Sequence, residues 1–260
     1  MNKKKKLKAM AGSALALSGL YGRSFGDRAM IVAFHRIDDR YPDDPISCTV
    51  NAFRDFCLFF KRHFEIVTLD ALLDDLEQER SISRKLAVTF DDGYLDNYTS
   101  AAPILSELAI PATFFIATGF IGTDRVPWWD EDAGIHSEWM DWHHLEELVS
   151  AGFTLGAHTV NHVDLGVVSG DEARKEIDDS RRVLEDRLGI AVDLFAFPYG
   201  RAHQLSEENR ATVRELGLRC APSCEGGLVL PGDDPFRLRR VPISPWYESV
   251  GQFAWEVRRR

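Results

Sequence analysis

Two pairs of side chains in this sequence are of the types that bind metal ions and transfer protons. Asp91 and Asp92 stand next to each other directly after a short apolar run, and His158 and His162 stand four residues apart after another. Two carboxylates side by side both ionise at low cost only when a cation lies near them. Two imidazoles and one carboxylate with an open fourth position form a catalytic zinc site. The sequence therefore predicts a divalent metal held by Asp92, His158 and His162.

Neither pair is specific when it is taken alone. The sequence Asp91-Asp92-Gly93 also suits an ordinary turn without any function. His158 and His162 share one face if they lie in one turn of a helix, as we expect here. The longer zinc signatures add further ligands to such a pair. The order of elements along the chain therefore has to decide between turns and a site.

Short apolar runs alternate along the chain with longer amphipathic runs. This alternation predicts βαβ units and a parallel sheet, hence an α/β protein. A distorted (β/α) barrel of TIM type with seven or eight parallel strands is favoured for residues 29–260, because such barrels typically take about 250 residues. An open doubly wound sheet is the alternative, but no glycine-rich phosphate loop follows the first strand. Strands are expected at 29–34, 65–69, 86–90, 112–117, 153–157, 193–197, 218–221 and 241–244, and helices at 51–62, 70–79, 96–109, 141–151, 170–188, 205–216 and 246–258.

The reactive groups all follow predicted strands. His35 follows the first strand, Asp91 and Asp92 the third, His158 the fifth, and the tight turn 198–200 the sixth. The carboxyl ends of the strands in a parallel barrel share one face, where barrel enzymes build their active sites. This shared position favours one functional site over four unrelated turns.

A long segment, 119–141, interrupts the alternation of strands and helices. It contains Trp128, Trp129 and Trp139, and Trp142 follows it, so four of the six tryptophans of the chain gather here. A loop of this length inside a compact domain is usually functional or disordered, and the tryptophans argue against disorder. Two uses stay open: the rings pack the loop against the barrel, or Trp128 and Trp129 form a surface on which sugar rings stack.

Composition limits the partners of the protein. The net charge of −10 offers no basic face for nucleic acid. The exception is the basic and apolar segment 1–28, where five lysines precede the apolar run 9–20. That run is too short to span a bilayer. It suits a short helix at the bottom of the barrel or a weak contact with a membrane surface, with a secretory signal as the alternative. We therefore expect a cytoplasmic or membrane-associated protein rather than an exported one, and we interpret the four cysteines as structural.

Three sequence motifs resemble those of one enzyme family. Thr89–Gly93 matches the first motif of the NodB-like polysaccharide deacetylases, carbohydrate esterase family four. His158–His162 matches their His-Ser/Thr-x-x-His motif, and Phe195–Gly200 resembles their third motif in part. The resemblance extends from Met30 to Ile243, which is most of the chain. It implies a barrel of the NodB homology type and removal of N-acetyl groups from an acetylated amino sugar or polysaccharide.

The resemblance also implies roles for individual residues. Asp91 is the general base, and Asp92, His158 and His162 hold one divalent ion. Zinc is expected, with cobalt, nickel and manganese as alternatives, because this ligand set suits several divalent ions. The backbone N–H of Tyr199 stabilises the oxyanion.

Substrate contacts are expected from two stretches of the chain. Pro198 and Tyr199 belong to the third motif of the family, and Trp128 and Trp129 belong to the tryptophan-rich segment. The expected partner is an N-acetylated glycan. The sequence gives no indication of the oligomeric state.

The chain departs from the family pattern at two points. Ala196 stands where the third motif carries an arginine that braces the catalytic aspartate, so Arg240 is the candidate brace, with an ordinary exposed arginine as the alternative. The late Leu-x-His motif, whose histidine serves as general acid, is missing, and His35 is the candidate replacement. Some deacetylases of poly-N-acetylglucosamine resemble this arrangement, with circularly permuted barrel units. The exchange is harmless in a closed barrel, where the first and last strands are neighbours.

Two other classes of function compete with the deacetylase. The missing arginine is consistent with a weakly active or inactive sugar-binding module. The same metal chemistry attacks any accessible amide, so an amidohydrolase acting on a small amide other than a sugar is the second alternative.

Overall fold

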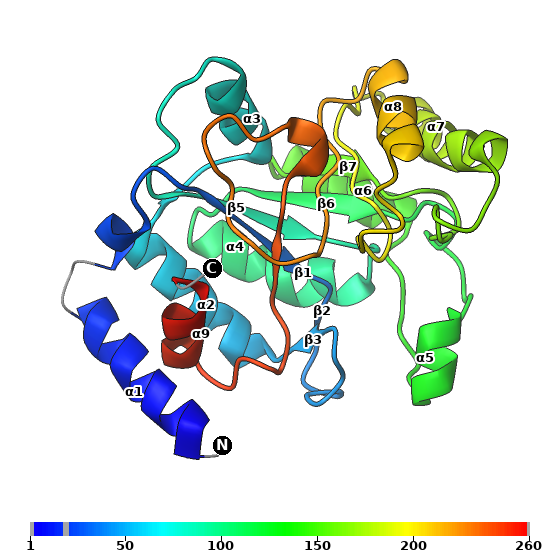
Figure 1. Cartoon of the computed structure of the whole chain (residues 1–260). Helices are drawn as coiled ribbons and strands as arrows, with labels where there is room; N and C mark the ends of the chain where they lie inside the picture. The colour runs from blue at the N-terminus through cyan, green and yellow to red at the C-terminus, as the bar shows by residue number, and fades with distance from the viewer. Residues whose placement is uncertain (1–2, 18–20, 259–260) are drawn as a thin grey trace.

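The described part of the chain, residues 3–17 and 21–258 of a computed structural model, folds around one parallel sheet. Its strands are β1 (Met30–Phe34), β4 (Glu65–Ile66), β5 (Lys85–Phe90), β6 (Ala112–Ile116), β7 (Thr154–Ala157) and β8 (Val241–Pro242). They lie in the order β7-β6-β5-β1-β8, and β4 pairs with the start of β5. Figure 1 shows this sheet at the centre, with helices on its outer side. The α/β prediction is confirmed.

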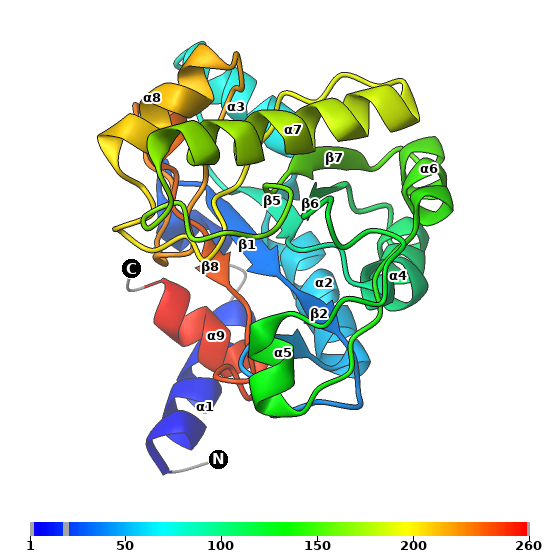
Figure 2. The ribbon, with the colours of Figure 1, turned by 90° about the vertical axis from the view of Figure 1, so that its right-hand side faces the viewer.

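Single β-bridges close the sheet into a distorted barrel. Beyond β7, parallel bridges join Ala157 to Phe195, Leu194 to Cys220, and Ser223 to Arg239. Next comes β8, which pairs with β1, so the ring is complete (Figure 2). The strands predicted at 193–197 and 218–221 are thus reduced to bridges. The proline at position 198 and the one at 222, which have no N–H to donate, limit the ladder on this side.

The register of β1 against β5 brings their ends together. The pairing runs from Met30 opposite Leu86 to Phe34 opposite Phe90. The Asp91 N–H donates to the Phe34 carbonyl oxygen at 2.9 Å, so the residues that follow the two strands are also neighbours.

The helices around the sheet agree with the amphipathic runs of the sequence. Thr49 caps the first of them and Ser169 the longest, because each side chain accepts from a backbone N–H three residues on. The segment predicted as one helix at 96–109 is instead a π-helical turn, η2 (Asn97–Ala101), followed by α4. The remaining bounds are α2 (Val50–His63), α3 (Leu69–Glu77), α4 (Ala102–Glu107), α6 (Trp142–Ser150), α7 (Gly170–Leu188), α8 (Glu207–Glu215) and α9 (Val250–Val257).

Two small features were not predicted from the sequence. After β1 the chain forms β2 (Arg36–Ile37), which pairs with β3 (Ser47–Cys48). The tryptophan-rich segment contains α5 (Trp128–Ala133), which projects from the body of the barrel (Figure 1). Both features lie beyond the carboxyl ends of the strands and border the site described below.

The N-terminal segment contains a helix, α1 (Lys3–Leu17), that packs along α9 (Figure 1). Glycines allow the close approach, because a Cβ on Gly12 would lie 1.8 Å from the Gly251 carbonyl oxygen. Lys8 forms an ion pair with Glu256 at 2.9 Å. The end of the apolar run, residues 18–20, lies outside the described residues. Within the described ranges, no helix combines the length and the hydropathy needed to cross a membrane.

Candidate metal centre and active site

Asp92, His158 and His162 meet at the carboxyl ends of β5 and β7. Their ligand atoms all lie within 4.8 Å of one another, and the three residues are buried. The Asp92 Oδ1 atom lies 3.4 Å from His158 Nε2 and 3.2 Å from His162 Nε2. Burial acts to raise the pKa of Asp92, but His162 and His158 outweigh it and hold the pKa well below its usual value.

The residues fit a divalent ion on three further observations. His158 Nδ1 lies 2.8 Å from the Ala196 carbonyl oxygen, which holds the proton on Nδ1 and leaves the Nε2 lone pair for a metal. The buried Asp92 Oδ1 atom has no hydrogen-bond partner. Oxygen and imidazole nitrogen are also the donors that zinc prefers at such sites. Asp92, His158 and His162 would therefore hold the ion, and a fourth position can stay open.

The two histidines do not lie in a helix, so our expectation for 158–162 was wrong. The segment is an irregular turn in which Thr159 has φ 63° and His162 has φ 52°. Glu176 of α7 stabilises it by accepting from the backbone N–H groups of Val160 and Asn161. The turn, rather than helical periodicity, brings both Nε2 atoms to Asp92.

Left-handed backbone conformations gather at this site. Seven described residues other than glycine have positive φ, and four of them are here: Asp92 (76°), Thr159, His162 and Tyr199 (59°). Such conformations cost free energy in residues with a Cβ and persist where the surrounding structure holds them. The surrounding barrel therefore fixes the directions of the Asp92, His162 and Tyr199 side chains.

Asp91 is held separately, by Arg240. The guanidinium donates from Nη1 to Asp91 Oδ1 and from Nη2 to Asp91 Oδ2, both at 2.7 Å, and Arg240 is fully buried. Burial acts to raise the pKa of Asp91, and Arg240 with His158 outweighs it, so the pKa is lowered. The alternative of an exposed arginine does not hold. Arg240 therefore braces Asp91, although Ala196 stands where the family motif carries its arginine.

His35 and Cys224 lie beside the Oδ2 atom of Asp91. His35 Nε2 is 3.9 Å from Asp91 Oδ2, and burial lowers the pKa of His35 although both aspartates oppose this effect. Cys224 accepts from Arg240 Nη2 at 3.2 Å, and burial raises the pKa of its thiol to about 11. Nothing in the local sequence distinguishes Cys224 from the other cysteines.

A cavity of about 540 Å³ opens over these groups. Apolar side chains form part of its wall, with Trp128 and Trp129 among them. The Trp129 ring lies 4.6 Å from the ring of His162, and Trp128 Nε1 donates to the Tyr199 hydroxyl at 3.1 Å. The lining consists of His35, Asp44, Pro45, Ile46, Asp91, Asp92, Trp128, Trp129, Asp132, Ala133, His158, His162, Tyr199, Arg201, Cys224 and Pro242.

The cavity contains most of the predicted site residues and several that were missed. Pro198 is not part of the lining, although its neighbour Tyr199 is. Arg240 lies behind Asp91 and does not face the cavity. Pro45 and Ile46, from the loop before β3, were missed because nothing in their local sequence indicates that this loop folds back over the barrel mouth. The assigned roles of the residues stay predictions.

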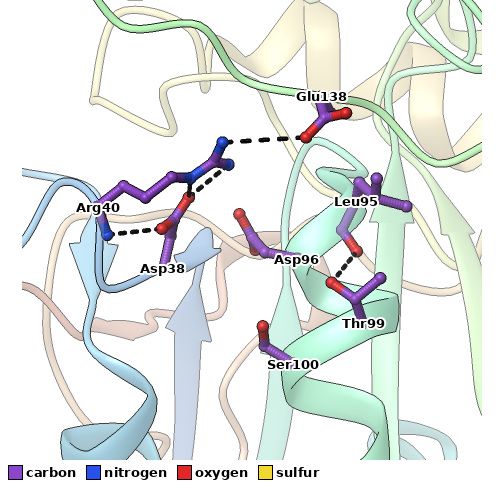
Figure 3. Close-up of a pocket in the computed structure, with 7 residues that line it drawn as sticks. All are labelled: Asp38, Arg40, Leu95, Asp96, Thr99, Ser100 and Glu138. Atoms are coloured by element: carbon purple, nitrogen blue, oxygen red, sulfur yellow. Dashed lines mark hydrogen bonds and ion pairs between the residues drawn. The ribbon is translucent and has the colours of Figure 1, made fainter.

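A second, smaller pocket of about 220 Å³ lies beside the backbone that follows His35 (Figure 3). Its acidic groups have partners: Asp38 accepts from Arg40, and Asp96 accepts from the Ile37 N–H at 2.8 Å. Burial raises the pKa of Asp96 to about 7. The contacts of Asp96 in this pocket stabilise β2, and its acidic side chains form no second candidate active site.

The sequence profile of polysaccharide deacetylases matches residues 78–221, more than half of the 260 residues. This chain belongs to the polysaccharide deacetylase family. The matched region includes Asp91, Asp92, His158 and His162, whereas His35 and Arg240 lie outside it. The resemblance seen in the motifs is confirmed.

Two relatives show how far the similarity extends. YxkH of Bacillus subtilis (strain 168), named for the same family, is 26% identical over 171 residues, which cover 65% of this chain and 56% of YxkH. A poly-β-1,6-N-acetyl-D-glucosamine N-deacetylase of Staphylococcus aureus (strain MSSA476) is 24% identical over 251 residues, which cover 92% of this chain and 82% of that protein.

Solved structures share the fold of this family member. IcaB from Ammonifex degensii superposes with a TM-score of 0.72 at 22% identity, covering 88% of this chain and 98% of that one. The Streptococcus pyogenes deacetylase PplD, in complex with acetate, gives 0.70 at 21% identity, covering 84% and 93%. The predicted distorted barrel is therefore the fold of known deacetylases.

Metal content should distinguish the ligands from the base. After zinc loading and dialysis, we expect Asp92→Ala and His158→Ala to lose the ion, because each leaves only two of the three ligands. The matched variant Asp91→Asn should keep the ion and lose turnover by about 10²-fold or more, the usual contribution of a general base. Full occupancy in both ligand variants, or loss of the ion in Asp91→Asn, would contradict these assignments.

The pH profile should reveal the role of Arg240. Asp91 can take a proton only when it is ionised, and Arg240 is the main group that offsets its burial. Arg240→Gln should therefore raise the pKa of Asp91 and move the acidic limb of kcat/KM to higher pH. The neighbouring Arg239 is exposed and has no contact with Asp91, so Arg239→Gln is the control. An unchanged acidic limb in folded, metal-loaded Arg240→Gln would remove the bracing role.

Proposed function

We propose that the protein is a metal-dependent hydrolase that removes N-acetyl groups from an acetylated amino sugar or polysaccharide. One observation carries the proposal: the ligand set Asp92, His158 and His162 lies beside an ionised Asp91 that Arg240 fixes from behind. A base next to a metal site is the arrangement that hydrolyses an unactivated amide. Membership of the polysaccharide deacetylase family supports the sugar amide as substrate.

The residues of the chain divide the reaction among them. A divalent ion, when bound, supplies Lewis acidity to the amide carbonyl and lowers the pKa of a water molecule. Asp91 takes a proton from the attacking water, whose oxygen forms a bond to the carbonyl carbon. The Tyr199 N–H donates to the developing oxyanion. His35 gives a proton to the amide nitrogen as the C–N bond breaks, and the products are acetate and the free amine. We propose zinc as the ion, with cobalt, nickel and manganese as alternatives.

The proposed substrate is an oligomer of N-acetylglucosamine. Trp128 and Trp129 give the cavity aromatic walls, which suit the apolar faces of sugar rings. The similarity of most of the chain to a poly-β-1,6-N-acetyl-D-glucosamine N-deacetylase makes the β-1,6-linked polymer the first to test. The alternative of an inactive sugar-binding module was motivated by the missing arginine of the third motif. Arg240 contacts Asp91 in its place, so this motive no longer applies. The assay described next also tests the alternative of an amidohydrolase that acts on a small amide other than a sugar.

An acetate-release assay tests the proposal. Purified protein, loaded in turn with zinc, cobalt, nickel or manganese, is given β-1,6-linked and β-1,4-linked N-acetylglucosamine oligomers and a set of small cyclic and acyclic amides. We expect acetate from the sugar oligomers, and release slower by about 10²-fold or more from the Asp91→Asn variant. Hydrolysis of the small amides alone would replace the proposed substrate class, and no release from any compound would overturn the proposed activity.

His35 should matter only when the leaving group needs a proton. His35→Ala should slow release of acetate from the sugar amide by about 10²- to 10⁴-fold, the range for a general acid. An acetylated aryl ester leaves without protonation, so the variant should hydrolyse it nearly as fast as the parent. Equal losses on both substrates would point to a structural role for His35 and would require another acid at the barrel mouth.

The cytoplasmic or membrane-associated location stays a proposal, and the surface of α1 supports the membrane contact alone. Leu7, Met10 and Leu17 are 69%, 71% and 69% exposed on the side away from α9, with Lys3 and Lys4 exposed nearby. Apolar side chains beside lysines suit an anionic lipid surface. The protein should sediment with vesicles that contain phosphatidylglycerol and remain free with pure phosphatidylcholine, and Met10→Glu should weaken sedimentation. Equal sedimentation with both kinds of vesicle would contradict the proposal.

A further inference from the structure

A buried ion pair that the proposed chemistry does not use ties the tryptophan-rich segment to the start of β2, just after β1. Arg36, next to His35, is 1% exposed, and its Nη2 donates to the 1%-exposed Asp130 of α5. Its Nη1 donates to Asp44 at 2.8 Å. The guanidinium also lies over the Tyr94 ring at 4.5 Å and donates to the Tyr94 hydroxyl at 3.0 Å. One side chain thus joins three separate parts of the barrel mouth.

Tyr94 extends these contacts to the metal centre. Its hydroxyl accepts from Trp129 Nε1 at 2.9 Å, so Arg36 and Trp129 meet at the same oxygen. The Trp129 ring lies 4.6 Å from the ring of the metal ligand candidate His162 and 6.3 Å from that of Tyr199. The position of Trp129 over the cavity therefore depends on the group that Arg36 holds.

The helix α5 cannot hold this position by itself. It has six residues, which is too short for a stable isolated helix. It projects from the barrel, so its placement depends on its anchors (Figure 1). A second ion pair joins the same two segments, from Arg40 to Glu138 at 3.9 Å (Figure 3). Its partners are 55% and 68% exposed, and exposed pairs of this kind contribute little.

We propose that Arg36 is a positioning residue that seats α5 through Asp130 and so holds Trp129 as a wall of the substrate cavity above His162. Successive residues of extended backbone point to opposite sides. His35 faces Asp91 and Arg36 faces α5, so the short extended segment from β1 to β2 places both the acid candidate and the aromatic wall. A lysine cannot replace Arg36, because an ammonium lacks the planar fork that serves Asp130, Asp44 and Tyr94 together. The part that concerns substrate rests on the proposed deacetylase function.

Two isosteric variants on the same segment test whether the Arg36–Asp130 pair holds α5 in place. Asp130→Asn removes the buried charge pair, and Glu138→Gln removes the exposed one. Chymotrypsin under native conditions should cleave Asp130→Asn at Trp128 and Trp129 about tenfold faster or more, because cleavage follows the population with α5 released. Glu138→Gln should be cleaved like the parent. Equal cleavage of the two folded variants would overturn the proposal.

A second pair of variants keeps the test possible if Asp130→Asn does not fold. Arg36→Lys retains a charge opposite Asp130, and the double variant Arg36→Gln/Asp130→Asn removes both charges of the buried pair together, while Asp44 keeps its hydrogen bonds from the Ile46 N–H and the Ser47 hydroxyl. Both should show the faster cleavage, while the melting of the whole protein and its zinc content stay close to those of the parent. Parent-like cleavage of the folded double variant would show that other contacts seat α5.

Kinetic measurements then test whether the position of α5 affects substrate binding. With an N-acetylglucosamine oligomer that the parent deacetylates, Arg36→Lys and Asp130→Asn should raise KM at least several-fold, while hydrolysis of an acetylated aryl ester, which does not need the wall, changes little. Unchanged KM together with faster cleavage would overturn the role in substrate positioning. If the parent releases acetate from no glycan, the proposed function fails, but the cleavage comparison still decides whether Arg36 seats α5.

Discussion

The site is organised by the need to give two adjacent buried carboxylates separate positive partners. Asp91 and Asp92 are each about 2% exposed at the end of β5, a position where two unpaired negative charges would not both persist. Arg240 takes both oxygens of Asp91, which leaves Asp92 to the histidines. This division gives neighbours in sequence different surroundings: a guanidinium holds one carboxylate, and two imidazoles face the other.

The barrel supports this division through contacts behind the reactive groups. The Ala196 carbonyl oxygen orients the His158 ring. Glu176 of α7 holds the backbone between the two histidines in an unfavourable conformation. Strain at the site is therefore offset by hydrogen bonds from elements that are themselves regular. The same logic applies at the mouth, where buried polar groups of Arg36 and Tyr94 support an aromatic side chain that faces the cavity.

Motif and strand position together predicted that Asp91, Asp92, His158 and His162 come together, because these residues follow the ends of strands. Arg240 stands before β8 and was a candidate only because Ala196 replaces the arginine of the family motif. The barrel could also be predicted, because β1, β5, β6 and β7 are short apolar runs that alternate with longer amphipathic runs. The conformation of 158–162 could not, because positive φ at Thr159 and His162 follows from contacts with Glu176 that are distant in sequence. Nor could the weak strands at 193–197 and 218–221, where local apolar patterning is strong but few ladder hydrogen bonds form. Arg36 escaped notice because a charged residue after a strand is usually solvated, and only the fold shows that Asp130 covers it.

The strands of the barrel are joined by many hydrogen bonds on one side and by few on the other, so the two sides should differ in their local opening. Continuous hydrogen-bonded ladders join β1, β5, β6 and β7, whereas single bridges carry the ring from Ala157 to Arg239. Backbone amides on the bridged side should exchange with solvent through local opening well below the free energy of global unfolding. That side carries Tyr199, Cys224 and the Ser223 carbonyl oxygen that accepts from Arg240 Nε. On gentle heating, loosening should therefore begin on the side that holds Tyr199 and the Ser223 contact of Arg240, while the ladders that lead to Asp92 and His158 are still closed.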